Sequence, residues 1–411
     1  MNSVTPTRTR GFRLKSRGTF WSATVVLALG LWASGAPSVL YPSYAAEWNL
    51  PSVVITTVFG TYPVALLITL LIFGGVSDVI GRRRTMLIGI ALIGIAAAVF
   101  ALAPNVGFLY VGRVLQGVGT GFALGAASAA LVENNTSSNP RFPSSLTTIS
   151  TAVGLTLALV LSGLLAQFAP LPLALSYIVL FALSVVALVF VGLSRDARPA
   201  TPGARWRPQP IRLPRGLFRP FLAATLSVSV AYSVGAIFLS LGALMARQLT
   251  GTTNLLVIGA ILGLSSFFIG ATALFLQKVP AHIAIVIGGT LSIAGLGLMA
   301  ATAASGSIAL FLAWCVVGGI AYSFAFTGGL GLINRTARPE HRGATLSLLY
   351  LFAYLLQAAT AIGAGALATA IGLAAAVDIA APVVGVLCLA AILFAVADLA
   401  SRRRTLAPQT S

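Results

Sequence analysis

Long apolar runs alternate with short polar segments along almost the whole chain. Each run has roughly 20 residues or more, enough to cross about 30 Å of hydrocarbon as an α-helix that satisfies its own backbone hydrogen bonds. The pattern predicts an all-α membrane protein with twelve transmembrane helices in two sets of six. The expected spans are residues 20–46, 52–73, 85–103, 106–132, 144–168, 172–193, 220–246, 254–276, 283–303, 307–333, 344–370 and 372–399.

The polar segments predict how the chain is divided. A basic segment before an apolar run also begins a signal peptide, but the first run is too long for a signal peptide's apolar region. The stretch between the two sets of six is rich in Pro and Arg, as expected of a linker. We therefore expect a cytoplasmic tail (1–19), an N-terminal six-helix half (20–193), a cytoplasmic linker (194–219), a C-terminal six-helix half (220–399) and a second cytoplasmic tail (400–411).

Composition and charge agree with this division. Only 8% of the 411 residues are charged, against about 25% in soluble domains, and the mean hydropathy is +0.99. With both termini in the cytoplasm, every Lys and Arg except Arg113 and Arg247 falls in a cytoplasmic segment, as the positive-inside rule requires. The net charge of +18 then faces anionic lipid, not nucleic acid. We expect a multi-pass protein of a bacterial inner (plasma) membrane.

Catalytic and cofactor chemistry is not indicated. The two cysteines lie in apolar runs, and His282 and His341 lie in separate loops, so no cluster with metal-ligand spacing is present. Neither Lys15 nor Lys278 follows a glycine-rich phosphate loop, which argues against ATP-driven transport by this chain. We expect no metal, no cofactor and no enzyme activity.

The most strongly charged interruption in the first half is Gly-Gly-Val-Ser-Asp-Val-Ile-Gly-Arg-Arg-Arg, residues 74–84. Two spans joined by so few residues must be antiparallel neighbours, and the charges mark the membrane surface. An ordinary positive-inside loop would need the arginines but not the spacing of Gly and Asp. The stretch resembles the signature loop between the second and third helices of the major facilitator superfamily of secondary transporters, which it matches at Gly74, Asp78, Gly81, Arg82 and Arg84.

The resemblance implies that this loop is a conformational latch. Asp78 would contact the cytoplasmic end of the eleventh span near Arg342 and Gly343, and hold that side closed while the outside is open. A carboxylate is favoured at a helix N-terminus. The alternative is local pairing of Asp78 with Arg82 or Arg83, which is compatible with the latch.

Arg113 is the charged residue well inside a span, where it costs several kcal/mol (about 3 on insertion scales) unless it faces a polar interior. The stretch 112–119, Gly-Arg-Val-Leu-Gln-Gly-Val-Gly, resembles the superfamily's fourth-helix motif. This implies proton coupling or cavity bracing by Arg113 with Gln116. The alternative is a structural Arg113 that bonds backbone carbonyls of the first span. Glu47, near the outer end of that span, is the first candidate for a coupling proton, and its alternative is a solvated loop carboxylate.

The resemblance also implies a central cavity lined by spans 1, 4, 7 and 10. No acid lies in the middle of these spans, so a cavity that held Arg113 would favour neutral or anionic solutes over cations. Polar and aromatic residues recur at helical spacing on the faces expected to line it, although ordinary helix packing explains any one of them alone. These candidates are Trp32, Ser34, Ser38, Tyr41, Tyr232, Ser233, Trp314, Tyr322, Phe326, Tyr350, Tyr354 and Gln357.

Taken together, the sequence predicts a secondary active transporter that resembles the drug and metabolite exporter branch of the superfamily. Its partners would be a small-molecule substrate, protons and the lipid bilayer, and we expect a monomer. The fifth span lacks the Gly-Pro pair of many exporters, which leaves the direction open. The alternatives are proton-linked uptake of a small organic anion or nutrient, and a non-transporting membrane sensor or scaffold.

Overall fold

The computed structural model describes residues 16–138, 142–194, 217–337 and 339–406. Twelve of the helices in these residues are long and apolar enough to cross a membrane, as the sequence predicted. They are α1 (Ser16–Glu47), α2 (Ser52–Phe73), α4 (Arg82–Ala101), α5 (Val106–Glu133), α6 (Phe142–Phe168), α7 (Leu175–Leu193), α8 (Phe218–Thr250), α9 (Leu255–Phe275), α10 (Ala281–Ser305), α11 (Ile308–Thr336), α12 (Pro339–Ile371) and α13 (Leu373–Leu406).

Two features of these helices differ from the sequence prediction. The helices extend past the apolar runs, so that α8 reaches Thr250 and α13 reaches Leu406, because a helix can continue into the headgroup region where its polar side chains are solvated. A short helix, α3 (Val76–Ile80), also forms inside the charged loop between α2 and α4, where only a connection was expected.

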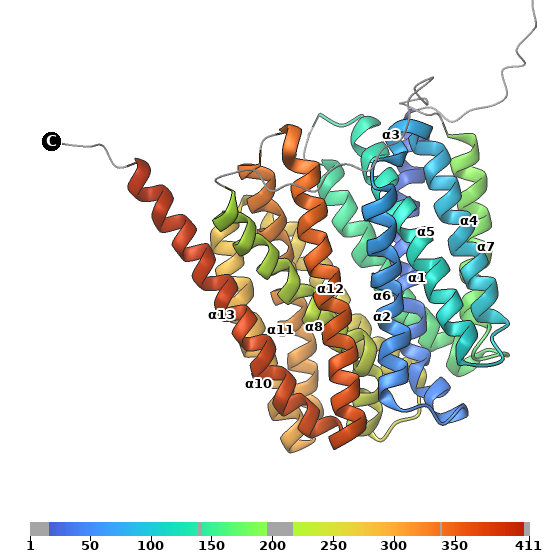
Figure 1. The fold of residues 1–411 in the computed structure, drawn as a ribbon. Coiled ribbons are helices and arrows are strands. Elements are labelled where there is room, and N and C mark those ends of the chain that lie inside the picture. The colour runs from blue at the N-terminus through green and yellow to red at the C-terminus, as the bar shows by residue number, and fades with distance from the viewer. Residues whose placement is uncertain (1–15, 139–141, 195–216, 338, 407–411) are drawn as a thin grey trace, which may run out of the picture.

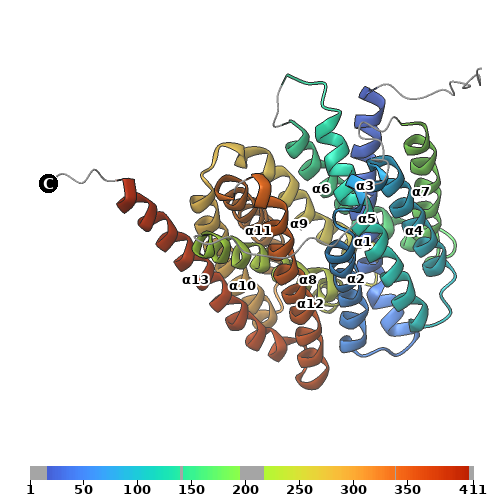
Figure 2. The ribbon, with the colours of Figure 1, turned by 45° about the horizontal axis from the view of Figure 1, so that its top comes forward.

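The helices form two bundles that lie side by side (Figure 1). Helices α1, α2 and α4–α7 make up the N-terminal half, and α8–α13 make up the C-terminal half; a turned view keeps the same division (Figure 2). The short helix α3, the start of α1 and the end of α13 lie at one end of the molecule, which we call the α3 face. The other end is called the opposite face.

The two halves contact each other chiefly through three helix pairs: α2 with α12, α6 with α9, and α1 with α8. Glycine permits the close approach of α6 and α9. A Cβ added at Gly163 would lie 2.3 Å from the carbonyl oxygen of Leu255, and one added at Gly259 would lie 2.4 Å from that of Leu159. Leu255 begins α9 near the opposite face, so the halves are packed together at this end.

Candidate functional site

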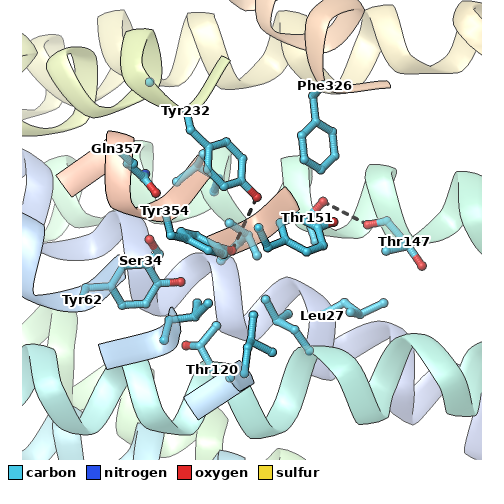
Figure 3. A pocket seen from close by; sticks show the side chains of 18 of the residues that line it. Leu27, Ser34, Tyr62, Thr120, Thr147, Thr151, Tyr232, Phe326, Tyr354 and Gln357 are labelled. Atoms are coloured by element: carbon cyan, nitrogen blue, oxygen red, sulfur yellow. Dashed lines mark hydrogen bonds between the residues drawn. The ribbon is translucent and has the colours of Figure 1, made fainter. Parts of the chain in front are cut away.

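A cavity of about 730 Å³ lies between the two halves. Its wall runs from Gly74, Gly75 and Asp78 at the α3 face to Ser34 and Trp314 deep between the bundles. Helices of both halves contribute side chains, and Figure 3 shows phenol rings, hydroxyl groups and an amide directed into the space. The cavity is therefore a candidate site for a solute that both halves touch at once.

Many residues that the sequence proposed for a cavity lie in this wall. Tyr232 comes from α8, and three further helices provide the rest. The predicted residues that line the cavity are Ser34, Tyr232, Trp314, Tyr322, Phe326, Tyr350, Tyr354 and Gln357.

The other predicted cavity residues lie elsewhere. Trp32 and Tyr41 are in the packed core of the N-terminal half, and Ser38 is fully buried. Ser233 is also buried and accepts a hydrogen bond of 3.1 Å from Thr360. These residues do not border the cavity because they lie on faces of α1 and α8 that pack against neighbouring helices.

Sequence reasoning missed several wall residues. One comes from α5, the fourth span, which was expected to line the cavity, and the others come from α2 and α6, to which no cavity residue was assigned. Tyr62 on α2 and Thr120 on α5 lie beside Ser34 (Figure 3). From α6, Thr147 and Thr151 also line the wall. Their spacing of four residues places them on one helix face, a signal that the sequence carried.

Arg113 does not line the cavity, because its side chain is fully buried inside the N-terminal half. Its guanidinium donates to the carbonyl oxygen of Ser34 at 3.1 Å, to Oε1 of Gln116 at 2.7 Å, and to the hydroxyl of Tyr41. The rings of Tyr41, Phe59 and Tyr62 surround it, with centroids 5.6–5.9 Å from Cζ. These contacts hold α1, α2 and α5 together by charge-assisted hydrogen bonds and cation–π attraction.

Gln116 makes a separate contact with α1, a helix that contains Pro37 in its interior. Proline lacks a backbone N–H, so the carbonyl of the residue four positions earlier loses its helical partner. That residue is Ala33, and the side-chain amide of Gln116 donates to its carbonyl oxygen. The pair Arg113 and Gln116 thus satisfies the carbonyls of Ala33 and Ser34 at the point where α1 is weakened.

Glu47 lies at the end of α1 near the opposite face and is exposed to solvent. Each hydrogen bond that the structure gives for the Arg113 guanidinium ends on a neutral group of α1 or α5. None of these bonds joins Arg113 to Glu47. The expected role of Glu47 in proton movement therefore rests on its position at the end of α1, the helix that Arg113 braces.

The predicted latch residues converge at the α3 face. The guanidinium of Arg82 lies 2.5 Å from the carboxylate of Asp78 and 3.3 Å from that of Glu133, and it also donates to the hydroxyl of Ser77. Between Asp78 and Arg82, Gly81 turns the chain with a φ of 94°, a conformation suited to glycine.

The neighbouring arginines differ in their surroundings. Arg83 donates to the carbonyl oxygens of Val191, at 3.2 Å, and Gly192 at the end of α7, while Arg84 is exposed. The local pairing of Asp78 with Arg82 is thus present. The structure describes the backbone of residues 342 and 343 but not the side chain of Arg342. The expected contact of Asp78 with Arg342 and Gly343 therefore stays a prediction.

Charge is scarce in the wall. Among the lining residues that the structure describes, only Asp78 carries a formal charge, and it lies at the mouth of the cavity. Arg113 therefore does not face a solute in this cavity. The preference for anions depended on Arg113 lining the cavity, so that argument no longer applies. The geometry offers hydrogen bonds and aromatic surface to a solute, but no described counter-charge at depth.

Solved structures of transporters share this fold. The nucleoside transporter NupG matches with a TM-score of 0.74 over 92% of this chain and 99% of that one, at 14% identity. A bacterial homolog of the human lysosomal transporter Spinster, in an inward-facing and occupied conformation, matches with a TM-score of 0.69 over 93% and 96%, also at 14% identity.

Curated relatives match over shorter segments. The lincomycin resistance protein of Streptomyces lincolnensis is 31% identical over 157 residues, which is 38% of this chain and 31% of that protein. Polyol transporter 5 of Arabidopsis thaliana is 32% identical over 133 residues, or 32% of this chain and 24% of that protein. The puromycin resistance protein pur8 of Streptomyces alboniger is 33% identical over 28% and 23% of the two chains. The matches span less than a third of each of these three relatives.

The family model of the Major Facilitator Superfamily matches residues 20–289, well over half of the chain. The twelve candidate spans among the described residues, the cavity between the two halves and the fold shared with solved transporters agree with this match. The chain belongs to the Major Facilitator Superfamily.

Proposed function

We propose that this protein exports a small drug-like or metabolite molecule from the cytoplasm across the inner (plasma) membrane, by proton-coupled alternating access and as a monomer. The observation that carries the proposal is the cavity, which reaches the α3 face and is bounded by packed helices toward the opposite face. A cavity open to one side is what alternating access requires of one of its two states.

Hydrogen bonds between the halves support a closed opposite face. Thr369 of α12 accepts from the backbone N–H of Val53 on α2 at 2.9 Å, and Gln167 of α6 accepts from that of Leu255 on α9 at 2.8 Å. Arg247 of α8 donates to the carbonyl oxygen of Pro42 on α1 at 3.4 Å. These few bonds can break as a set when the halves rock, which is the movement we propose.

The direction rests on charge and on relatives. The α3 face carries the arginines that follow Gly81 on α4, and basic residues mark cytoplasmic loops. The cavity would therefore open to the cytoplasm and take up its solute there. Two curated relatives are resistance proteins, against lincomycin and against puromycin, which favours export.

For the coupling we propose Arg113 and Gln116 as the elements that link proton movement to the position of α1, with Glu47 as the first candidate to carry the proton. Arg113 is buried and touches α1 beside the cavity residue Ser34. A proton that changed the charge balance around this network would alter how firmly α1 is held, and so bias the two states.

Uptake is the second candidate, because several relatives from Arabidopsis thaliana are named polyol transporters and one is named a D-xylose-proton symporter-like protein. In that case the same cavity would release its solute to the α3 face. The charge-poor wall suits an uncharged nutrient better than an organic anion.

Purified protein in liposomes with a pH-sensitive dye inside tests these proposals. A solute added outside the liposomes, under an imposed pH gradient, should drive proton flux. The direction of the proton flux relative to the solute separates export by exchange from uptake together with protons. Arg113→Ala should keep solute exchange at equal pH but lose the proton dependence, and Glu47→Gln should do the same if Glu47 carries the proton. Solute exchange without proton flux would overturn the coupling, and no flux with any solute would favour a non-transporting sensor or scaffold.

A further inference from the structure

The charge of the cavity wall limits what the cavity can hold. Asp78, the charged lining residue among those described, is paired with Arg82 at 2.5 Å and lies at the mouth. Deeper in, the lining side chains that the structure describes are hydroxyls, an amide and apolar groups. A charged solute would lose its water there without gaining a counter-charge, which is costly. An uncharged solute meets no such cost.

The C-terminal half offers an aromatic surface made of nearly parallel rings. The rings of Tyr232 and Phe326 lie 5.9 Å apart with an angle of 14° between their planes, and Tyr322 lies 6.4 Å from Tyr232 at 19°. Tyr322 and Phe326 are themselves stacked at 5.9 Å and 23°. All three line the cavity. Rings so nearly parallel present a common orientation to a solute, whose own ring or polarised C–H face can pack against them.

The facing part of the wall offers hydrogen bonds. Ser34, Tyr62 and Thr120 of the N-terminal half bring three side-chain hydroxyls together, and Gln357 of α12 lies across from them (Figure 3). Oε1 of Gln357 is buried and has no hydrogen-bond partner among the described residues. A buried acceptor without a donor is costly to leave, so a small rotation of this lining side chain toward a solute hydroxyl would satisfy it.

From these two walls we infer that the cavity selects uncharged, hydroxyl-rich solutes that also carry a flat ring. The ring lies against Tyr232 and Phe326, while the hydroxyls bond the cluster of Ser34, Tyr62 and Thr120 and donate to Gln357. This inference rests on the proposed function, because it names the solute class of the same cavity.

Equilibrium binding to the purified protein tests the inference without requiring transport. The probes are 4-nitrophenyl β-D-glucopyranoside, which has both features; methyl β-D-glucopyranoside, which lacks the ring; 4-nitroanisole, which lacks the hydroxyls; 4-nitrophenyl β-D-glucuronide, an anion; and 4-(aminomethyl)phenyl β-D-glucopyranoside, a cation. The neutral aryl glucoside should bind most tightly, by about threefold to tenfold or more over each other probe. Equal or tighter binding of either ion, or no binding of the aryl glucoside, would overturn the inference.

Variants test which wall binds which part of the probe. Tyr232→Ala should weaken binding of the aryl glucoside and of 4-nitroanisole by about threefold to tenfold and leave binding of methyl glucoside unchanged. Gln357→Leu should weaken the two neutral glucosides and spare 4-nitroanisole. Tyr110→Phe is the matched control, because its hydroxyl bonds Thr57 and does not line the cavity. If Tyr232→Ala does not fold, Phe326→Leu tests the same surface.

The outcomes separate the inference from the proposed function. Selective binding without solute flux in liposomes would refute transport by the purified protein and leave the solute class standing. Flux that prefers the glucuronide over the neutral glucoside would leave transport standing and refute the solute class. A variant pattern in which Gln357→Leu weakens all probes alike would show a structural role for Gln357 and contradict the polar wall.

Discussion

At the scale of single residues, the buried guanidinium of Arg113 makes a clear prediction. It spans Ser34, Gln116 and Tyr41 with two separate nitrogens, which the single nitrogen of lysine cannot do. Arg113→Lys keeps the charge but should lower the free energy of unfolding by about 1.5–3 kcal/mol for each charged hydrogen bond lost. Thermal unfolding in detergent measures this as a lower melting temperature, and an unchanged value would show that charge alone matters.

The carbonyl of Ala33 gives a second test at this scale. Gln116→Leu removes its donor, and the buried acceptor should cost about 1–3 kcal/mol. Pro37→Ala supplies a backbone N–H at position 37 that can donate to this carbonyl within α1. The double variant should thus be more stable than Gln116→Leu alone, as a double-mutant cycle of melting temperatures would reveal. Strict additivity of the two single effects would refute the link between Pro37 and Gln116.

Residues also mark the limit of what the sequence could predict. That a buried arginine in a span needs polar partners follows from its cost in hydrocarbon. Backbone carbonyls of the first span were one alternative set of partners, and Ser34 supplies such a carbonyl. The face of α1 that borders the cavity did not follow. Ser34 lines the cavity while Ser38, one turn later, is packed inside, because the cavity does not extend along α1 as far as Ser38. Side-chain spacing alone carries no information on how far a cavity extends.

At the scale of helices, the contact of α2 with α12 depends on the absence of one side chain. A Cβ added at Gly365 would lie 1.8 Å from Oγ1 of the buried Thr56, whereas one added at Gly363 would meet nothing within 4 Å. Gly365→Ala should therefore push the helices apart and disfavour the closed opposite face by about 1–3 kcal/mol. Gly363→Ala, two residues away on the same helix, is the control.

Spin-label distances across the opposite face, from labels near the ends of α2 and α12, can measure this shift. The Gly365→Ala variant should show a larger population of long distances than the wild type, and Gly363→Ala should not. Equal distributions for both variants would mean that the contact of α2 and α12 does not determine which side is closed.

A buried carboxylate links the last span to α10 at the α3 face. Asp398 of α13 lies 2.7 Å from both His282 at the start of α10 and Arg402 on its own helix, and its side chain is only 5% exposed. Asp398→Ala leaves two polar groups without their acceptor and should cost about 1–3 kcal/mol. Arg402→Ala should cost less than about 1 kcal/mol, because that side chain is 43% exposed. Melting temperatures would rank the two, and the reverse order would contradict this account.

At the scale of the whole molecule, the apolar runs were sufficient to predict twelve spans. A single apolar run crosses the bilayer as an uninterrupted helix, because only then are its backbone groups bonded within the run. The short helix α3 could not be predicted in the same way. Its five residues are too few for a periodic pattern, and its place is set by tertiary bonds from Arg82 to Ser77 and Glu133. The participation of α2, α6 and α9 in the cavity wall likewise depends on how the halves are tilted, which composition does not encode.

The orientation of the molecule in the membrane is a prediction at this scale. Among the described residues, the basic residues at helix ends of the α3 face include Arg82–Arg84, Arg219, Lys278, Arg335 and Arg402. The described basic residue at a helix end near the opposite face is Arg247. Such an asymmetry places the α3 face in the cytoplasm. The two native cysteines are buried, so single introduced cysteines can report the side with a membrane-impermeant maleimide.

Intact cells should label Leu102→Cys, since Leu102 is 77% exposed and follows α4 at the opposite face. They should not label Ser137→Cys, which lies beyond α5 at the α3 face and is exposed there, until the membrane is opened. The reverse pattern would place the cavity mouth outside the cell. The structure would then represent an outward-facing state, and a solute taken from the cytoplasm could not enter the cavity in it. The same labelling thus tests both the topology and the direction of transport that depends on it.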